Sequence, residues 1–218
     1  VEIDPRTGEP VQDVRFTLDE ACYADYAAAL LPEIGRYAQL ALETGQPPTI
    51  VDMMQYGAAV SGLQYYATAA DKFTWRDVRD GIYGQTMVLR EPVGVVGAVA
   101  AWNVPLFLAC NKLGPALLAG CTVVLKPAAE TPLSVNALAE VFTEAGLPEG
   151  VLSVVPGGAE TGRALTGNPN VDKYTFTGSS AVGKEVGRIA AEKLKPCTLE
   201  LGGKSAAIIL EQYLHNLA

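Results

Sequence analysis

Short apolar runs alternate with helix-like segments along the second half of this chain, and this alternation limits the fold more than any other feature. We predict strands at 95–100, 122–125, 151–155, 174–177, 198–201 and 206–210, and helices at 106–118, 132–145, 160–166 and 180–193. Strands that are apolar on both faces belong to parallel sheets covered by helices on each side. Because crossover connections are right-handed, the expected fold is α/β, a Rossmann-like doubly wound parallel sheet of about five strands.

The first 91 residues have a different pattern and are predicted as a helical N-terminal region that packs on this sheet. Helices are expected at 18–30, 32–43 and 52–72, and a strand at 86–90. In the third helix, apolar residues recur at steps of three and four, which predicts one buried face: Met53, Tyr56, Val60, Leu63 and Ala67. The expected domains are a helical region at 1–91 and a dinucleotide-binding α/β domain at 92–211.

Two helices of the α/β domain carry further signals. Thr131 is predicted as the N-cap of the helix that starts with Pro132, a residue pair typical of helix N-termini. In the helix at 180–193 we expect one face to point inward, formed by Val182, Val186, Ile189 and Ala190.

Composition excludes several classes of function. The 218 residues carry a net charge of −8, which argues against a nucleic-acid partner, because such proteins need a basic face. No apolar run reaches the ~18 residues that cross a bilayer, and the acidic N-terminus shows no secretory signal, so we expect a cytoplasmic protein without a membrane partner. The four cysteines lack metal-site spacing and the single histidine is His215, so we expect reduced thiols and no metal.

Polar residues and glycines follow each predicted strand. In a parallel sheet, ligands bind beyond the carboxyl ends of the strands, so these residues are expected to outline one site. The segments concerned are 101–105, 126–132, 156–158, 178–183 and 200–204.

Three of these segments allow both a functional and a structural interpretation. The segment 178–183 opens a helix, where free N–H groups favour an anion such as a pyrophosphate, although an ordinary N-cap would have the same sequence. Lys126 could donate to ribose hydroxyls or extend to water. Asn103 could donate to a developing oxyanion or only form a turn.

Glu200 is the strongest candidate for proton chemistry. It stands between Leu199 and Leu201, directly before a Gly-Gly turn. Apolar flanks raise the pKa of a carboxyl group, so Glu200 could be a general base, or else a structural carboxylate paired with a nearby cation.

The order and spacing of these motifs resemble the cofactor-binding portion of the NAD(P)-dependent aldehyde dehydrogenase superfamily. The resemblance runs from about residue 33 to residue 211 and is dense from Arg90 onward. The matching segments are Glu-Pro-Val-Gly-Val-Val at 91–96, Trp-Asn-Val-Pro at 102–105, Lys-Leu-Gly-Pro-Ala-Leu at 112–117, Gly-Cys-Thr-Val-Val-Leu-Lys-Pro at 120–127, Ala-Gly-Leu-Pro at 145–148, Phe-Thr-Gly-Ser at 176–179 and Leu-Glu-Leu-Gly-Gly-Lys at 199–204.

The resemblance implies oxidation of a small-molecule aldehyde to a carboxylic acid with NAD or NADP, usually in a homo-oligomer. Asn103 would hold the aldehyde oxygen, and Glu200 would activate the water that releases the acid. The residues expected beside the cofactor are Ala101, Trp102, Lys126, Gly158, Gly178, Ser179, Leu201 and Gly202. In such enzymes a cysteine thiolate attacks the aldehyde, hydride leaves to the cofactor, and water hydrolyses the thioester.

The chain also departs from the family pattern. The nucleophilic cysteine would follow the Glu-Leu-Gly-Gly motif by about thirty residues, in a catalytic domain that we expect to be absent from this chain; none of its four cysteines has that position. The tail at 212–218 is atypical. Ala129 stands where a ribose-binding carboxylate is expected, with Glu130 one residue later, which leaves NAD and NADP open.

Two other functions are compatible with these residues. One is a truncated, non-catalytic nucleotide-binding or interaction protein. The other is a dehydrogenase that forms an acyl-CoA, which Glu200 argues against, because a thiol acceptor needs no water-activating base.

Overall fold

A parallel sheet of five strands forms the centre of the molecule, as the alternating pattern predicts. The protein is represented by a computed structural model that describes residues 34–203. The strand order is β5-β4-β3-β6-β7, and the strands are β3 (Val95–Val99), β4 (Thr122–Lys126), β5 (Leu152–Val154), β6 (Lys173–Gly178) and β7 (Cys197–Leu201). All four pairings are parallel. The predicted helix at 18–30 and strand at 206–210 lie outside the described residues.

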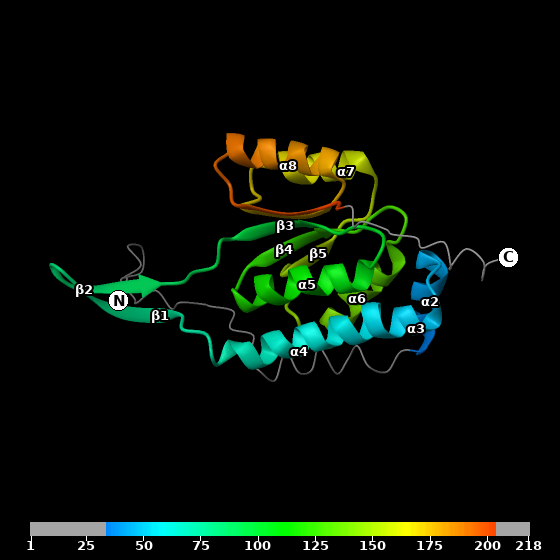
Figure 1. The fold of residues 1–218 in the computed structure, drawn as a ribbon, viewed down its shortest axis with the longest axis horizontal. Helices are drawn as coiled ribbons and strands as arrows, with labels where there is room; N and C mark the ends of the chain where they lie inside the picture. The colour runs from blue at the N-terminus through cyan, green and yellow to red at the C-terminus, as the bar shows by residue number, and fades with distance from the viewer. Residues whose placement is uncertain (1–33, 204–218) are drawn as a thin grey trace, which may run out of the picture.

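Helices cover both faces of the sheet. One face carries α5 (Pro105–Leu118) and α6 (Leu133–Glu144), and the other carries α7 (Ala159–Gly167) and α8 (Ser180–Glu192) (Figure 1). The chain passes from β3 outward to β4 and β5, then returns to form β6 on the other side of β3. This reversal makes the carboxyl ends of β3 and β6 the topological switch point, where doubly wound sheets bind ligands.

The N-terminal helices form a layer beneath α5 and α6. They are α2 (Ile34–Thr44), α3 (Pro48–Ile50), the π-helix η1 (Val51–Gly57) and α4 (Ala58–Ala70), which lies along α5 (Figure 1). The predicted single α-helix at 52–72 is therefore wrong at residues 52–57. A π-helix uses more residues per turn and rotates the buried face, so Val51 and Gln55 are buried while Met53 is exposed.

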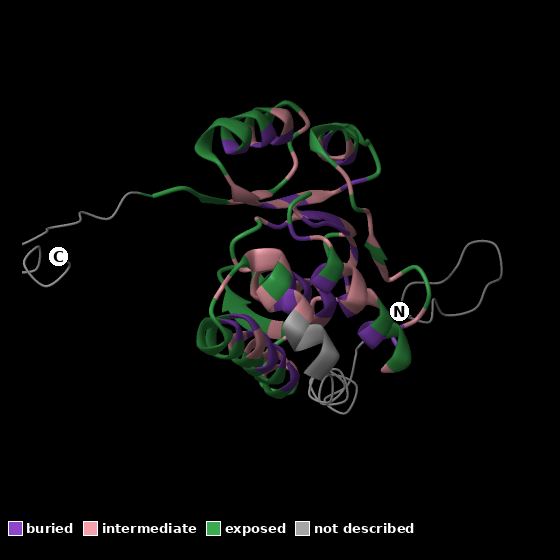
Figure 2. Cartoon of the chain, turned by 90° about the vertical axis from the view of Figure 1, so that its right-hand side faces the viewer, coloured by how far each residue is buried: buried purple, intermediate pink, exposed green. Residues whose placement is uncertain are grey.

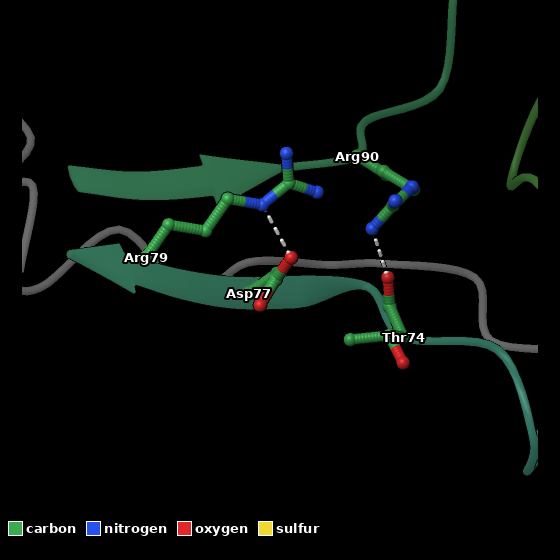
Figure 3. A network of polar contacts seen from close by, with 4 residues as sticks. All are labelled: Thr74, Asp77, Arg79 and Arg90. Atoms are coloured by element: carbon green, nitrogen blue, oxygen red, sulfur yellow. Dashed lines mark hydrogen bonds and ion pairs between the residues drawn. The ribbon is translucent and has the colours of Figure 1, made fainter. Parts of the chain in front are cut away.

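A two-stranded antiparallel hairpin interrupts the region that we expected to be helical. It pairs β1 (Arg76–Gly81) with β2 (Gly84–Leu89) and extends away from the sheet (Figure 1). The second strand was predicted, but the first was missed, because Arg-Asp-Val-Arg-Asp-Gly has no apolar face. Polar contacts support it instead: the Arg79 Nε is 2.7 Å from an oxygen of Asp77, and Arg90 donates to the carbonyl of Thr74 (Figure 3).

The main core lies between the sheet and the α4, α5 and α6 helices. Figure 2 shows buried residues gathered there. The cluster includes Leu63, Leu113, Leu125, Leu138 and Phe142. A smaller cluster lies under α8 and contains Tyr174, Phe176, Val186 and Ala190. Of the predicted inward face of α8, Val186 and Ala190 are buried, whereas Val182 is exposed. Burial of these side chains supplies the main driving force for folding.

The start of α6 differs from its prediction. Thr131 does not cap the helix; its hydroxyl donates to the carbonyl of Trp102 at 3.3 Å. The first turn is capped by Glu43 of α2, whose carboxylate accepts from the N–H groups of Leu133 at 3.0 Å and Ser134 at 3.2 Å and from the Ser134 hydroxyl. A carboxylate at a helix N-terminus satisfies free N–H groups and interacts favourably with the dipole. The cap therefore links α2 to α6.

Candidate functional site

The loop after β3 carries Asn103 and Trp102, whose side chains are exposed. The loop is held by its backbone. The Asn103 carbonyl accepts from Gln46 Nε2 at 2.7 Å and from Gln55 Nε2 at 3.4 Å, and the Trp102 carbonyl accepts from Thr131. The loop therefore has a fixed backbone and presents side chains that stay accessible to a ligand.

Lys126 ends β4 and is buried. Its Nζ donates to the carbonyl of Pro127 at 2.9 Å. A Cβ placed on Gly162 would lie 3.7 Å from Cδ and Cε of Lys126, so the lysine stem lies against the first turns of α7. Burial lowers the pKa of Lys126, and the nearby charge of Glu130 acts in the opposite direction.

Gly178 and Ser179 lie between β6 and α8. Ser179 is the N-cap of α8, and its hydroxyl accepts from the N–H of Val182 at 3.3 Å. The cap uses one N–H of the first turn and leaves others available, at the positive end of the helix dipole. The ordinary N-cap and the anion site considered for this segment are therefore compatible with each other.

A small cavity lies between α7 and α8 at the switch point. Its volume is about 160 Å³, and its walls come from β3, β6 and the two helices: Val99, Gly162, Thr166, Phe176, Val182 and Val186. Gly158, the N-cap of α7, directly precedes Ala159, which also lines this cavity. Lys126 borders it through Gly162.

Glu200 does not lie between buried leucines, which corrects the environment expected for it. Successive side chains of a strand point to opposite faces. A Cβ on Gly183 of α8 would lie 2.2 Å from Leu201 Cδ2, and one on Gly187 would lie 3.3 Å from Leu199 Cδ1. Both leucines therefore face α8, and Leu201 remains 40 % exposed. Glu200 points to the other face, where α5 lies.

Glu200 lines a groove of about 500 Å³ that runs along β6 and β7 on the α5 face. Thr177, its register partner on β6, lines the same groove, as do Thr175, Thr198 and Lys112. Lys112 is 8 % exposed and donates to Thr177 Oγ1 at 2.8 Å and to Thr175 Oγ1 at 3.2 Å. Burial lowers its pKa to about 8, and the charge of Glu200 opposes that shift.

Lys112 is the residue that sequence reasoning missed. It belongs to a segment that resembles the family, but we assigned no role to it. The sequence does contain a signal for it: Lys112 is the only charged residue in α5, and the other residues of that helix are mostly apolar. A lone lysine in a buried helix is costly unless the site uses it.

The predicted residues share one edge of the sheet but lie on two faces. Lys126 and Leu201 face α7 and α8, Ser179 caps α8, and Glu200 faces α5. Ala101 and Asn103 lie in the loop that leads from β3 to α5, and Gly202 follows β7 and is exposed. Of Asn103, Lys126, Ser179 and Glu200, Glu200 lines the groove, and none of the other three lines either cavity.

The cysteines of residues 34–203 are free thiols, and two of the three are buried as expected. Cys110 and Cys121 are buried, and Cys197 is half-buried at the start of β7. Burial raises the pKa of Cys110 to about 12 and also raises the pKa of Cys197. A raised pKa disfavours the thiolate, so these two groups are poor nucleophiles. Cys22 lies outside the described residues.

Neither a metal site nor a membrane span is found between residues 34 and 203. No three histidine, cysteine, aspartate or glutamate residues of this range come together as metal ligands. No helix of the same range has the length and apolar character to cross a bilayer.

Comparison with known proteins identifies the family. The model of the aldehyde dehydrogenase family matches residues 22–217, which is most of the chain. The chain belongs to the aldehyde dehydrogenase family. The geranial dehydrogenase of Castellaniella defragrans is 46 % identical over 173 residues, and the mitochondrial succinate-semialdehyde dehydrogenase of Arabidopsis thaliana is 43 % identical over 190 residues.

Solved structures of the family have the same fold. The aldehyde dehydrogenase of Mycobacterium tuberculosis, complexed with NAD+, is 67 % identical with a TM-score of 0.81, and the match covers 88 % of this chain and 41 % of that one. The matches to the geranial and succinate-semialdehyde dehydrogenases cover 79 % and 86 % of this chain, but 36 % and 35 % of those proteins. The chain thus spans about a third to two fifths of the length of these family members.

Proposed function

We propose that the protein carrying this chain oxidises an aldehyde to a carboxylic acid with NAD or NADP. The observation that carries the proposal is the arrangement at the switch point. Features suited to a dinucleotide lie on the α7–α8 face beside β3 and β6, and a carboxylate and a lysine lie on the α5 face beside β6 and β7, so β6 borders both groups. This chain would supply the cofactor site, the oxyanion donor and the general base.

The α7–α8 face fits a dinucleotide in three ways. The apolar cavity between the helices suits a flat ring such as adenine, Lys126 borders it where a ribose would follow, and the N-terminus of α8 with Ser179 suits the pyrophosphate. In this arrangement the nicotinamide ring would lie near Leu201 and Gly202, with Ala101 and Trp102 across the switch point. The NAD+ complex of the Mycobacterium tuberculosis relative supports this cofactor class.

The choice between NAD and NADP depends on the segment after Lys126. Ala129 has no carboxylate, while the charge of Glu130 acts on Lys126. A carboxylate near the ribose selects against a 2′-phosphate, so Glu130 favours NAD if its side chain reaches the ribose.

The chemistry uses a thiolate from a part of the protein other than residues 34–203, where the cysteines are buried or half-buried. The thiolate sulfur bonds to the aldehyde carbon, and the Asn103 amide donates to the oxygen as negative charge develops. When bound, the cofactor supplies the hydride acceptor, and loss of hydride leaves a thioester. Glu200 takes a proton from water, whose oxygen attacks the thioester carbon; the carbon–sulfur bond breaks, the acid is released and the thiolate is regenerated.

The test uses the full natural protein with a panel of aldehydes and measures NADH or NADPH formation by absorbance. We expect Asn103→Ala and Glu200→Gln each to lower turnover roughly a hundredfold or more, because each removes a group that acts in the transition state. Cofactor affinity should stay close to that of the wild type. Turnover that is unchanged in both variants would contradict the proposal.

A second candidate is a non-catalytic nucleotide-binding protein. It is favoured by the described cysteines: Cys110 and Cys121 are buried, and burial raises the pKa of Cys110 and of Cys197, which disfavours the thiolate. It predicts cofactor binding without aldehyde oxidation, so detectable NADH formation by the natural protein excludes it. The domain division at residue 92, the cytoplasmic location and the homo-oligomer remain predictions.

A further inference from the structure

The loop that carries Asn103 is anchored on both sides of one Cα atom. The Trp102 carbonyl belongs to the peptide group before Asn103, and the Asn103 carbonyl belongs to the peptide group after it. The first accepts from Thr131 Oγ1 at 3.3 Å, and the second accepts from Gln46 Nε2 at 2.7 Å and Gln55 Nε2 at 3.4 Å. Fixing both peptide planes fixes the direction of the Cα–Cβ bond between them.

The donors come from segments far away in sequence. Gln46 precedes α3, Gln55 lies in the π-helix η1, and Thr131 precedes α6. Gln55 also donates to Gln46 Oε1 at 3.0 Å, so the two amides form one network that ends at the Asn103 carbonyl. The N-terminal layer thus reaches the switch point through the side chains of Gln46 and Gln55.

Gln55 is an unusual residue for a purely structural position. It is completely buried, with 0 % of its surface exposed. A carbonyl oxygen only accepts hydrogen bonds, so the NH₂ group of Gln55 must face Asn103, which turns Oε1 away. That oxygen makes no hydrogen bond within residues 34–203. Leaving a buried acceptor unpaired destabilises the folded state, and a leucine there would avoid this cost.

The π-helix explains how this side chain arrives at the loop. Along a regular helix at 52–72, the pattern predicted that Tyr56 and Met53 would share the inward face. The extra residue in the turn brings Val51 and Gln55 inward instead. Irregular turns of this kind are stabilised less well than an α-helix and often occur at functional sites.

We propose that Gln55, with Gln46 and Thr131, is a positioning residue for catalysis: the three side chains fix the backbone of Asn103 so that its exposed amide points at the aldehyde oxygen. This inference rests on the proposed function, because it assigns the three residues to the oxyanion donor of that reaction. Small displacements of a donor matter, since an oxyanion hole acts only at hydrogen-bonding distance.

The test compares Gln55→Leu and Thr131→Val with Asn103→Ala in the full natural protein. Both positioning variants keep the side-chain volume and remove the donor. We expect each to lower the single-turnover rate of NADH formation about tenfold or more, less than Asn103→Ala does, with unchanged cofactor affinity. Thermal stability of Gln55→Leu should stay close to that of the wild type, because losing the unpaired oxygen offsets the loss of the two hydrogen bonds that the NH₂ group donates. Gln64→Leu, at an exposed position of α4, is the matched control and should have no effect on rate.

A double-mutant cycle decides whether the residues act through Asn103. In the Asn103→Ala background, Gln55→Leu and Thr131→Val should change the rate by less than twofold, because the donor that they position is gone. If the single variants turn over like the wild type, or if their losses multiply with that of Asn103→Ala, the inference is wrong. If Gln55→Leu does not fold, the cycle with Thr131→Val gives the same decision. If Asn103→Ala itself has no effect, the proposed function fails first and the inference falls with it.

Discussion

At the residue scale, the most distinctive group in the groove on the α5 face is the buried ammonium of Lys112. Lys112 donates to two threonine hydroxyls and lies near Glu200. Burial is the main cause of its lowered pKa. A charged ammonium in this position is desolvated, which two neutral hydroxyl partners offset only in part. The groove therefore contains a group whose charge changes at mildly alkaline pH.

This burial predicts a pH dependence of stability. The pKa of Lys112 falls from 10.5 to about 8 on folding, so between these values the unfolded chain binds more protons than the folded one. The free energy of unfolding should therefore rise as the pH increases through this window, by at most about 3 kcal/mol from this group. In Lys112→Met this rise should disappear, as measured by urea unfolding across the window.

The difference between the stability profiles of the wild type and Lys112→Met isolates the contribution of Lys112. The thiol of Cys110, with its pKa raised to about 12, contributes in the opposite direction above its ordinary value of 9.0 in both proteins, and it cancels in the difference. Lys184→Met, on the exposed face of α8, should keep the wild-type profile. Parallel profiles for the wild type and Lys112→Met would show that the buried lysine does not titrate as inferred.

For individual site residues, the sequence predicted which edge of the sheet they occupy, but not which face. Asn103, Lys126 and Ser179 do follow the strands that the apolar runs predicted. The face to which each side chain points could not be predicted, because it depends on register and on which helix covers which face. Glu200 illustrates this: its leucine neighbours in sequence lie on the opposite face of β7, and its neighbours in space, Thr177 and Lys112, come from β6 and α5.

At the element scale, the strands were the most predictable parts and the N-terminal layer the least. Short apolar runs bounded by turn residues favour buried strands, and all five strands of the parallel sheet were predicted within two residues of their bounds. The π-helix was not foreseen, because no simple periodicity distinguishes it from an α-helix. The cap of α6 was not foreseen either, since the sequence next to the helix offers Thr131, whereas the group that is used, Glu43, lies about 90 residues away.

The packing of α4 against α5 predicts that replacing two glycines by alanine has opposite effects on stability. A Cβ on Gly114 would lie 2.3 Å from Cδ2 of the Tyr66 ring, so the two helices meet at a site where only glycine fits. Gly114→Ala should lower the free energy of unfolding by about 1–3 kcal/mol, because the ring cannot yield without moving the helices. Gly62→Ala, on α4 with nothing within 4 Å, should instead be neutral or stabilise by up to about 1 kcal/mol through helix propensity.

Urea unfolding of both variants checks this pair. A change in the denaturant midpoint without a change in slope would show that stability changed while the surface exposed on unfolding did not. The packing argument fails if Gly114→Ala is as stable as Gly62→Ala.

The cap formed by Glu43 predicts that α6 depends on α2. Glu43→Ala removes the acceptor for two backbone N–H groups and one hydroxyl, and should lower the free energy of unfolding by about 1–2 kcal/mol. Alanine is itself a good helix former, so α2 should not be weakened by the substitution.

Glu144→Ala is the matched control at the other end of α6. Glu144 is exposed at the negative end of the helix dipole, so its removal should be neutral or slightly stabilising. Urea unfolding measures both variants, and equal stabilities would mean that Glu43 contributes nothing as a cap.

At the scale of the whole molecule, the sheet separates two tasks. The face with α7 and α8 has the small cavity and Lys126, and the face with α5 has the groove with Glu200. The doubly wound topology produces this division, because the chain changes faces between β5 and β6 while all strand ends stay at one edge. The sequence predicted the shared edge, but the division into two faces follows only from the three-dimensional order of strands and helices.

The division predicts that cofactor binding and chemistry can be impaired separately. Gly162 lines the small cavity, and a Cβ there already reaches contact distance, 3.7 Å, from the stem of Lys126. The further methyl groups of Gly162→Val would fill space that the cofactor needs, so the Kd of the full natural protein for NADH should rise about tenfold or more. Glu200→Gln lies across the sheet and should leave that Kd unchanged while slowing turnover.

Gly167→Val is the control, since Gly167 is exposed on the same helix with open space around it. Titration of each variant with NADH, followed by fluorescence, gives the three Kd values. If Gly162→Val binds as the wild type does, the cavity between α7 and α8 is not part of the cofactor site. If Glu200→Gln instead weakens binding as much as Gly162→Val does, the two faces do not have separate tasks. The dinucleotide must then cross the sheet edge into the groove beside Lys112.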